Sequence, residues 1–250
     1  MTRQTLLPGA IGALVLFAVA APAMADLIVN GDFESTPNGK ALRIDNKGQD
    51  WRESRRDGKA GTQMLKLSTK SIAGNATKKA MIKANPDRNT YLTQRLAEPM
   101  NGDFTISYDI CVHDILRDDN RSAFFMIGSS EDGKRGPNST GTERFVFLGF
   151  ENAADAGRIN LFAREGRLGW SERTLIAADL ELDHWYTIVV RVFTKAGEYE
   201  VTVEGVTEPV ALEAFTAGKK PPRKLTHLSF ASWNDGAGTF YVDNVHGHRD

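Results

Sequence analysis

Short stretches in which hydrophobic and polar residues alternate recur through most of the chain. Phe104–Val112 is the clearest, because every second residue is apolar, and this period of two predicts a strand with one buried face. Ser122–Gly128 and Arg144–Phe150 are almost wholly apolar, which is typical of central strands covered on both faces. Further strands are expected at Met64–Thr69, Tyr91–Leu96, Arg158–Ala163 and Arg173–Ala177. No stretch of ten or more residues after residue 25 has a helical period, so the pattern predicts an all-β protein.

Two pairs of strands are predicted to form hairpins. Trp185–Phe193 is rich in β-branched and aromatic residues, Thr194–Gly197 is a turn, and Glu198–Glu204 alternates on the return. Leu225–Val245 reads as two strands joined at Asn234–Gly236, whose residues tolerate the positive φ of a hairpin turn. In the last strand the period of two predicts one face with Phe240, Val242 and Asn244 and an opposite face with Tyr241, Asp243 and Val245.

The two ends of the chain after residue 25 resemble a known group of domains. LIVNGDFES (27–35) and TFYVDNV (239–245) are similar to the opening and closing strands of carbohydrate-binding-module jelly rolls and of their concanavalin-A-like relatives. HWYTIVVRVF (184–193) and GEYEVTVEG (197–205) are similar to paired strands of laminin-G-like and pentraxin-like sandwiches. The resemblance implies a two-layer antiparallel jelly-roll β-sandwich of the concanavalin-A-like type, with the first and last segments side by side.

Residues 1–25 have the three parts of a signal peptide. Arg3 supplies the positive charge, Leu6–Ala20 is apolar but short for a membrane span, and Ala23–Ala25 is a cleavage site of the A-x-A type. We therefore expect a secreted or periplasmic protein, with residues 26–250 as a single β-sandwich domain and no membrane span in the mature chain. The formal net charge of −1 gives no support to nucleic-acid binding. The single cysteine, Cys111, excludes an internal disulfide.

Asp243 is the most unusual residue of the last strand. An uncompensated carboxylate in an apolar strand costs several kcal/mol, so Asp243 is expected to have a cationic partner, and a metal ion is one option. In many of the domains that the ends resemble, a structural calcium lies near the meeting of the first and last strands. Oxygen ligands suit Ca²⁺, and the candidate ligands are Asn30, Asp32, Glu34 and Asp243. In the alternative, Asp243 pairs with an arginine, and Asn30 and Asp32 only form a turn.

A glycan-binding surface needs aromatic rings and polar side chains that bond to hydroxyl groups. The candidate ligand-binding residues are Trp51, Trp170, Trp233, His113, Arg121 and Arg144. The polar face of the strand Phe104–Val112 leads to His113, and guanidinium groups match the carboxylates or sulfates of an acidic polysaccharide. Trp51 is either a platform for a sugar ring or a plug that packs inward, and the arginines either bind a ligand or belong to a salt-bridged surface.

The sequence favours an exported protein that binds a polysaccharide or glycan without cleaving it, and it identifies no catalytic residue. One alternative is a polysaccharide lyase or glycoside hydrolase on the same fold, in which His113 or Tyr108 is the base and Arg121 or Arg144 neutralises a uronate. The chain has no G-x-S-x-G, H-E-x-x-H or phosphate-loop motif. A second alternative is a structural or adhesive extracellular protein with no small ligand.

Overall fold

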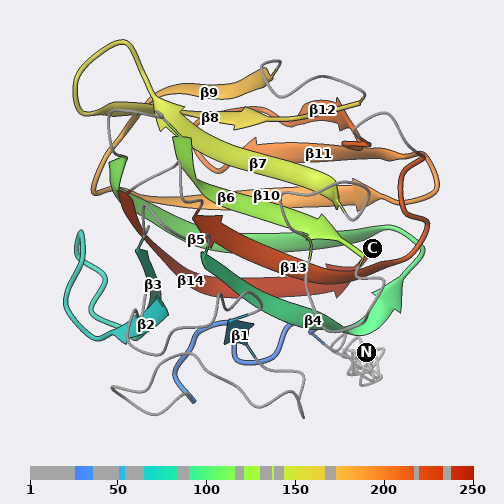
Figure 1. Ribbon diagram of the computed structural model, residues 1–250, viewed down its shortest axis with the longest axis horizontal. Helices are drawn as coiled ribbons and strands as arrows, with labels where there is room; N and C mark the ends of the chain where they lie inside the picture. Colours follow the sequence, from blue (N-terminus) through green and yellow to red (C-terminus); the bar gives the residue numbers. More distant parts are fainter. Residues whose placement is uncertain are drawn as a thin grey trace, which may run out of the picture.

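The structure is a computed structural model that describes residues 26–35, 51–53, 65–83, 90–115, 121–129, 137, 144–166, 173–216, 220–232 and 238–250. These residues form two stacked seven-stranded antiparallel sheets and no helix (Figure 1). The first sheet runs in the order β1 (Arg52–Glu53), β4 (Thr90–Met100), β13 (Leu225–Ser232), β6 (Arg121–Gly128), β7 (Arg144–Asn152), β8 (Arg158–Ala163) and β9 (Thr174–Glu181). The second runs in the order β12 (Val210–Glu213), β11 (Glu198–Val203), β10 (Trp185–Phe193), β5 (Phe104–Ile115), β14 (Gly238–Arg249), β3 (Lys79–Lys83) and β2 (Leu65–Ser68). This is the two-layer antiparallel β-sandwich that the resemblance implies, and it agrees with the all-β protein predicted from the pattern.

The strand predictions are confirmed for the long strands. The predicted bounds of β8 and β10 match the structure, and β10 pairs with β11 as the expected hairpin, with Ile188 opposite Val203. The short strands β1, β3 and β12 were not predicted. They have two to five residues, too few for a period of two to stand out from the surrounding sequence.

The hairpin predicted for Leu225–Val245 is wrong, although both of its strands exist. β13 pairs with β4 and β6 in the first sheet, whereas β14 pairs with β3 and β5 in the second. The chain therefore crosses from one sheet to the other between Ser232 and Gly238, a segment that lies outside the described residues. A run of turn residues indicates only that the chain reverses, and it does not distinguish a hairpin from a crossing between two sheets.

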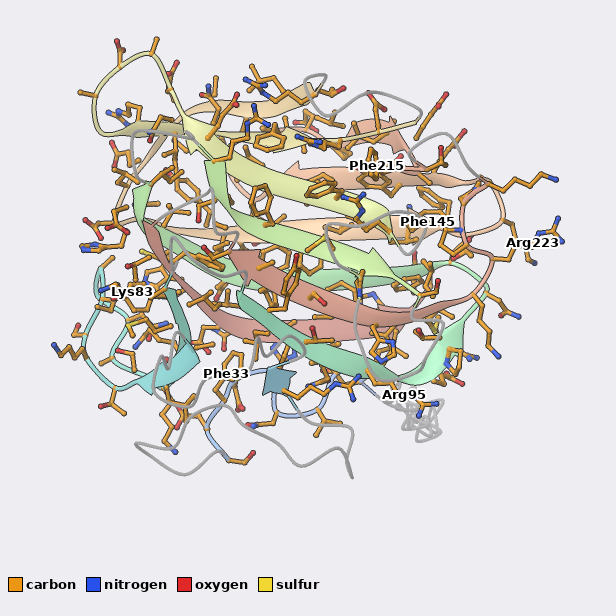
Figure 2. All side chains as sticks on the ribbon, viewed as in Figure 1. Phe33, Lys83, Arg95, Phe145, Phe215 and Arg223 are labelled. Carbon is orange, nitrogen blue, oxygen red and sulfur yellow. The ribbon has the colours of Figure 1, made fainter. Side chains whose placement is uncertain are left out.

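The main apolar core lies between the sheets, and the first sheet carries a second cluster on its outer face. The second cluster consists of Tyr91, Phe124, Met126, Phe147, Phe162, Phe215 and Ala231. On β6, Phe125 belongs to the main core and Phe124 to the outer cluster, and both are at most 1% exposed. β6 and β7 are thus buried on both faces, as their continuous apolar sequences predict. Phe215 lies toward the upper edge of the molecule in Figure 2.

The first and last segments lie side by side, as the resemblance implied. The amide of Leu27 donates to the carbonyl oxygen of Gly247 at 2.7 Å. Phe33 follows in the first segment and is labelled near the lower edge in Figure 2. The predicted alternation of the last strand stops at Asn244, where a β-bulge with φ of 48° shifts the register. Val245 therefore points into the core and not toward the face of Asp243, which corrects the prediction.

Candidate functional site

Asp243 lies on the outer face of the second sheet and is 1% exposed. Its Oδ2 accepts hydrogen bonds from Asn75 Nδ2 at 2.9 Å and from Thr77 Oγ1 at 2.8 Å, and its Oδ1 accepts one from the amide of Asn244 at 2.9 Å. Burial raises the pKa of Asp243 above its ordinary value, and these hydrogen bonds and the charge of Lys79 oppose that rise. The carboxylate is thus compensated by protein donors.

The cation beside Asp243 is the ammonium group of Lys79. Its side chain is 0% exposed, and its Nζ donates to the carbonyl oxygen of Lys70 at 3.0 Å and to that of Thr77. Burial lowers the pKa of Lys79, while the charges of Asp243 and Glu34 raise it. Backbone carbonyls and carboxylates are the groups that also bind calcium, and here they surround an ammonium group.

The other expected calcium ligands have partners of their own. Asp32 Oδ1 accepts the amide of Glu34 at 3.2 Å, Glu34 Oε1 accepts the amide of Lys78 at 2.8 Å, and Asn30 Oδ1 accepts the amide of Ser35 at 3.2 Å. Within the described part of the chain, no three histidine, cysteine or acidic side chains lie close enough to hold a metal ion. These side chains are thus engaged by donors of the protein itself, and the calcium site expected from the sequence stays a prediction.

Trp51 is buried in the core and does not form a platform for a sugar ring. It is 0% exposed, its ring centroid lies 5.3 Å from that of Phe33 and 6.0 Å from that of Phe230, and its Nε1 donates to the carbonyl oxygen of Asn30 at 2.9 Å. The plug alternative is the one that the structure shows. Trp170 and Trp233 lie outside the described residues, so their expected role stays a prediction.

Arg144, Arg164 and Arg173 pack against the aromatic rings on the outer face of the first sheet, with Cζ of Arg173 5.8 Å from the ring centroid of Phe162. Arg144 lies over Phe147 and Phe215, with its Cζ 4.7 and 4.5 Å from the two ring centroids. Arg164 lies 5.3 Å from Phe147. Arg144 and Arg164 are each 1% exposed, so in this conformation neither guanidinium group is presented to a polymer in solution. The expected role of Arg144 in ligand contact is therefore not supported.

Arg121 belongs to the same face but lies at the other end of β6 and β7. It pairs in register with Glu151, whose Oε2 lies 2.7 Å from Nε of Arg173. Burial lowers the pKa of Arg164 to about 10, and the positive charges of Arg121 and Arg173 add to that effect. Arg121, Arg164 and Arg173 thus interact electrostatically, and Arg121 and Arg173 are the more exposed of the three.

His113 lies in the other sheet, on the outer face that the sequence predicts to be polar. Its Nδ1 lies 2.6 Å from Oδ1 of Asp183. Further along the face, Asp109 accepts hydrogen bonds from Thr187 Oγ1 at 2.6 Å and from Asn244 Nδ2 at 2.8 Å. We call the side chains of Thr187, Asp109 and Asn244 the polar ladder. They come from β10, β5 and β14, respectively, and are at least partly exposed. The sequence does not show that Thr187 and Asn244 flank Asp109, because no local pattern marks a contact between strands.

The structure does not bring the predicted ligand residues into one site. Trp51 is in the core, Arg121 and Arg144 lie on the outer face of the first sheet, and His113 lies on the second sheet. Tyr108, the other base considered for a lyase, is 1% exposed between the sheets, where burial raises its pKa well above the ordinary value. Neither base therefore shares a face with Arg144.

No protein-family model and no curated protein matches the sequence. Solved structures do match. A conserved carbohydrate esterase from the Shiga toxin-encoding bacteriophage phi24B has a TM-score of 0.56 at 12% identity, covering 91% of this chain and 100% of that one. An alginate lyase from Klebsiella pneumoniae has a TM-score of 0.52 at 10% identity, covering 77% and 86%. An alginate lyase of polysaccharide lyase family 7 has a TM-score of 0.50 at 11% identity, covering 78% and 86%.

A sialidase also matches, but this chain spans only 17% of its length. At identities of 10 to 12%, the likeness to the esterase and the lyases shows a shared fold. Together with the two antiparallel sheets and the adjacent ends, it shows that the chain has a jelly-roll β-sandwich fold of the concanavalin-A-like type.

Proposed function

We propose that this chain is an exported carbohydrate-binding jelly-roll protein that does not cleave its ligand. The observation that carries the proposal is the polar outer face of the second sheet. There the carboxylate of Asp109 accepts hydrogen bonds from the hydroxyl group of Thr187 and from the amide group of Asn244. Such groups bond to sugar hydroxyls. The names of the structures that share the fold, a carbohydrate esterase and alginate lyases, support a carbohydrate as the ligand.

The separation of the acid–base candidates from the arginines supports binding without cleavage. A lyase needs its base and the group that neutralises the uronate on one substrate, within hydrogen-bond reach of it. Here His113 and Arg144 lie on different sheets, and Tyr108 is buried between them.

Export is part of the proposal and depends on residues 1–25, which lie outside the described residues. The described part of the chain contains no helix that is long and apolar enough to cross a membrane. Detection of the mature protein outside the cytoplasm, with Asp26 as its first residue, tests this part of the proposal.

A lyase is the second candidate, because one pair of suitable side chains does meet on the first sheet. Arg52 Nη2 lies 3.2 Å from Nε2 of His227, which also lies 2.7 Å from Thr226 Oγ1 through its Nδ1. His227 is 1% exposed, so a substrate reaches this pair only if the protein opens at that point.

A glycan array probed with the purified mature chain tests the proposed function. We expect retention on at least one polysaccharide without any product. Incubation with uronate polymers separates the two candidates, since a lyase releases an unsaturated product that absorbs in the ultraviolet. Retention on no glycan would leave a structural or adhesive role as the better explanation.

A further inference from the structure

Trp185 is the described tryptophan that reaches the surface. It opens β10 opposite Cys111 and lies on the outer face of the second sheet, partly exposed, whereas Trp51 is fully buried. Its Nε1 donates to the carbonyl oxygen of Ile72 at 2.8 Å. This bond fixes the indole ring on the sheet, so a ligand that stacks on the ring does not have to order it first.

A polar pair lies next to the indole ring in the same sheet. The amide of Asp183 donates to the carbonyl oxygen of Val112 at 2.9 Å. The connection before β10 thus stays bonded to β5 beyond the pair of Trp185 and Cys111. The side chains of His113 and Asp183 are 52% and 55% exposed. The imidazole and the carboxylate are therefore held together by their hydrogen bond and remain accessible beside the ring.

The polar ladder continues the surface on the other side of the ring. Thr187 is the next residue of β10 with the same orientation as Trp185, and it pairs in register with Asp109. We call His113, Asp183, Trp185 and the polar ladder of Thr187, Asp109 and Asn244 the Trp185 surface. Its residues come from three neighbouring strands and one connection, so they form one continuous strip.

The charge of the Trp185 surface indicates which sugars it accepts. Its carboxylates are those of Asp109 and Asp183. Burial raises the pKa of Tyr241, and the charges of Asp183 and of the nearby Asp114 add to that rise. The ammonium group of Lys79, which lies close enough to feel the charge of Asp243, is buried and not part of this surface. Carboxylates repel the uronate or sulfate groups of an acidic polymer and accept hydrogen bonds from neutral hydroxyl groups.

We propose that the Trp185 surface binds a neutral polysaccharide, with the indole ring stacked on the C–H face of a sugar and the two carboxylates accepting hydrogen bonds from its hydroxyl groups. The inference rests on the proposed carbohydrate-binding function and adds to it the binding face and the ligand class. It also separates this surface from the arginines of the first sheet, which the sequence associates with an acidic ligand.

Affinity gel electrophoresis tests the proposal, with soluble neutral glucans, xylans and mannans in one set of gels and with alginate and pectate in another. The variants are Trp185→Ala, Trp185→Phe, His113→Ala and Asp183→Asn. Leu175→Ala is the matched control, because Leu175 is an apolar side chain of the first sheet that is 54% exposed. Thermal unfolding of every variant verifies that it is folded, and the exposed His113 and Asp183 carry the test if Trp185→Ala does not fold.

We expect the wild type to be retarded by a neutral polymer and Trp185→Ala to bind it about tenfold or more weakly, as for other central aromatic contacts. Trp185→Phe should lose less, Asp183→Asn and His113→Ala should each weaken binding, and Leu175→Ala should match the wild type. Retardation of the wild type with unchanged binding by all four variants would overturn the Trp185 surface and leave the proposed function standing. Retardation by uronate polymers alone would overturn the ligand class, and retardation by no polymer would overturn the proposed function itself.

Discussion

The amide nitrogen of Val245 donates a hydrogen bond to the carbonyl oxygen of Gly31 at 3.0 Å. The two backbones approach so closely that a Cβ atom on residue 31 would lie 1.8 Å from the carbonyl oxygen of Val245. Only a glycine fits at this contact without movement of the chain. The glycine in the opening LIVNGDFES segment thus allows the first segment to lie against the last strand.

Gly31→Ala should therefore destabilise the protein. We expect a loss of about 1–3 kcal/mol in the free energy of unfolding, as for other insertions of a methyl group into a filled space. Urea unfolding followed by circular dichroism measures it. Gly102→Ala is the control, because a Cβ atom there meets nothing within 4 Å. Equal stability of the two variants would mean that the ends separate at little cost.

Thr77→Val should weaken the compensation of Asp243. The substitution keeps the shape of the side chain and removes the hydroxyl group that donates to Asp243 Oδ2 at 2.8 Å. Hydrogen bonds to charged groups contribute about 1.5–3 kcal/mol, so we expect a loss of about that size at neutral pH. Val189→Thr is the control, because it makes the reverse exchange of the same two side chains on the outer face of the second sheet. A Thr77→Val protein as stable as the wild type would show that this hydrogen bond contributes nothing net.

The stability of the wild type should depend on pH through Asp243. Burial raises its pKa in the folded protein above the ordinary value of 3.8, so the folded state binds the proton more readily than the unfolded state does. The stabilisation from this group is full below pH 3.8 and is lost as the pH rises through the folded pKa. Asp243→Asn lacks this titration. The wild type should therefore lose stability relative to Asp243→Asn as the pH rises. A stability difference that does not change with pH would contradict the raised pKa of Asp243.

Chelation should leave the melting temperature unchanged. The buried ammonium group of Lys79 and three hydrogen-bond donors already compensate Asp243. A metal bound only by the native state stabilises it by mass action, so thermal unfolding with EGTA and with added Ca²⁺ detects such a site. A melting temperature that falls with EGTA and recovers with Ca²⁺ would restore the calcium site expected from the sequence.

Cys111 should not react while the protein is folded. The thiol is 0% exposed, and burial, aided by the charge of Asp183, raises its pKa to about 12. Since the thiolate is the reactive form, a disulfide reagent at about pH 8 should label the native chain only on the time scale of unfolding. The denatured chain should give one thiol per molecule. Rapid labelling of the native protein would show that the thiol becomes accessible without global unfolding.

The alternation of hydrophobic and polar residues was sufficient to predict most of the strands and both faces of β5. The period of a strand is a local property, set by the pleat of its own backbone. Pairing between strands is not local, and it is here that the sequence misled, since β13 and β14 read as a hairpin but belong to different sheets. The β-bulge at Asn244 had the same effect at the level of one residue, because it reversed the expected orientation of Val245.

The sequence likewise indicated one part of the candidate site and not the other. Asp243 stood out in the sequence because a carboxylate in an apolar strand needs a partner, and that reasoning was correct. The partners themselves, Asn75, Thr77 and Lys79, precede Asp243 by more than 160 residues and carry no pattern that marks them. Trp51 and Trp185 are equally aromatic in the sequence, and only the packing shows that one is core and the other surface.

The sequence by itself determined that the chain is built of β-strands and which residues alternate between the two faces of a strand. Those properties follow from the backbone and from the local order of side chains. Tertiary structure alone decided which cation compensates Asp243, which rings reach the surface and which sheet each polar group joins. The reason is physical, since burial and charge compensation depend on distances in space between residues that are far apart along the chain.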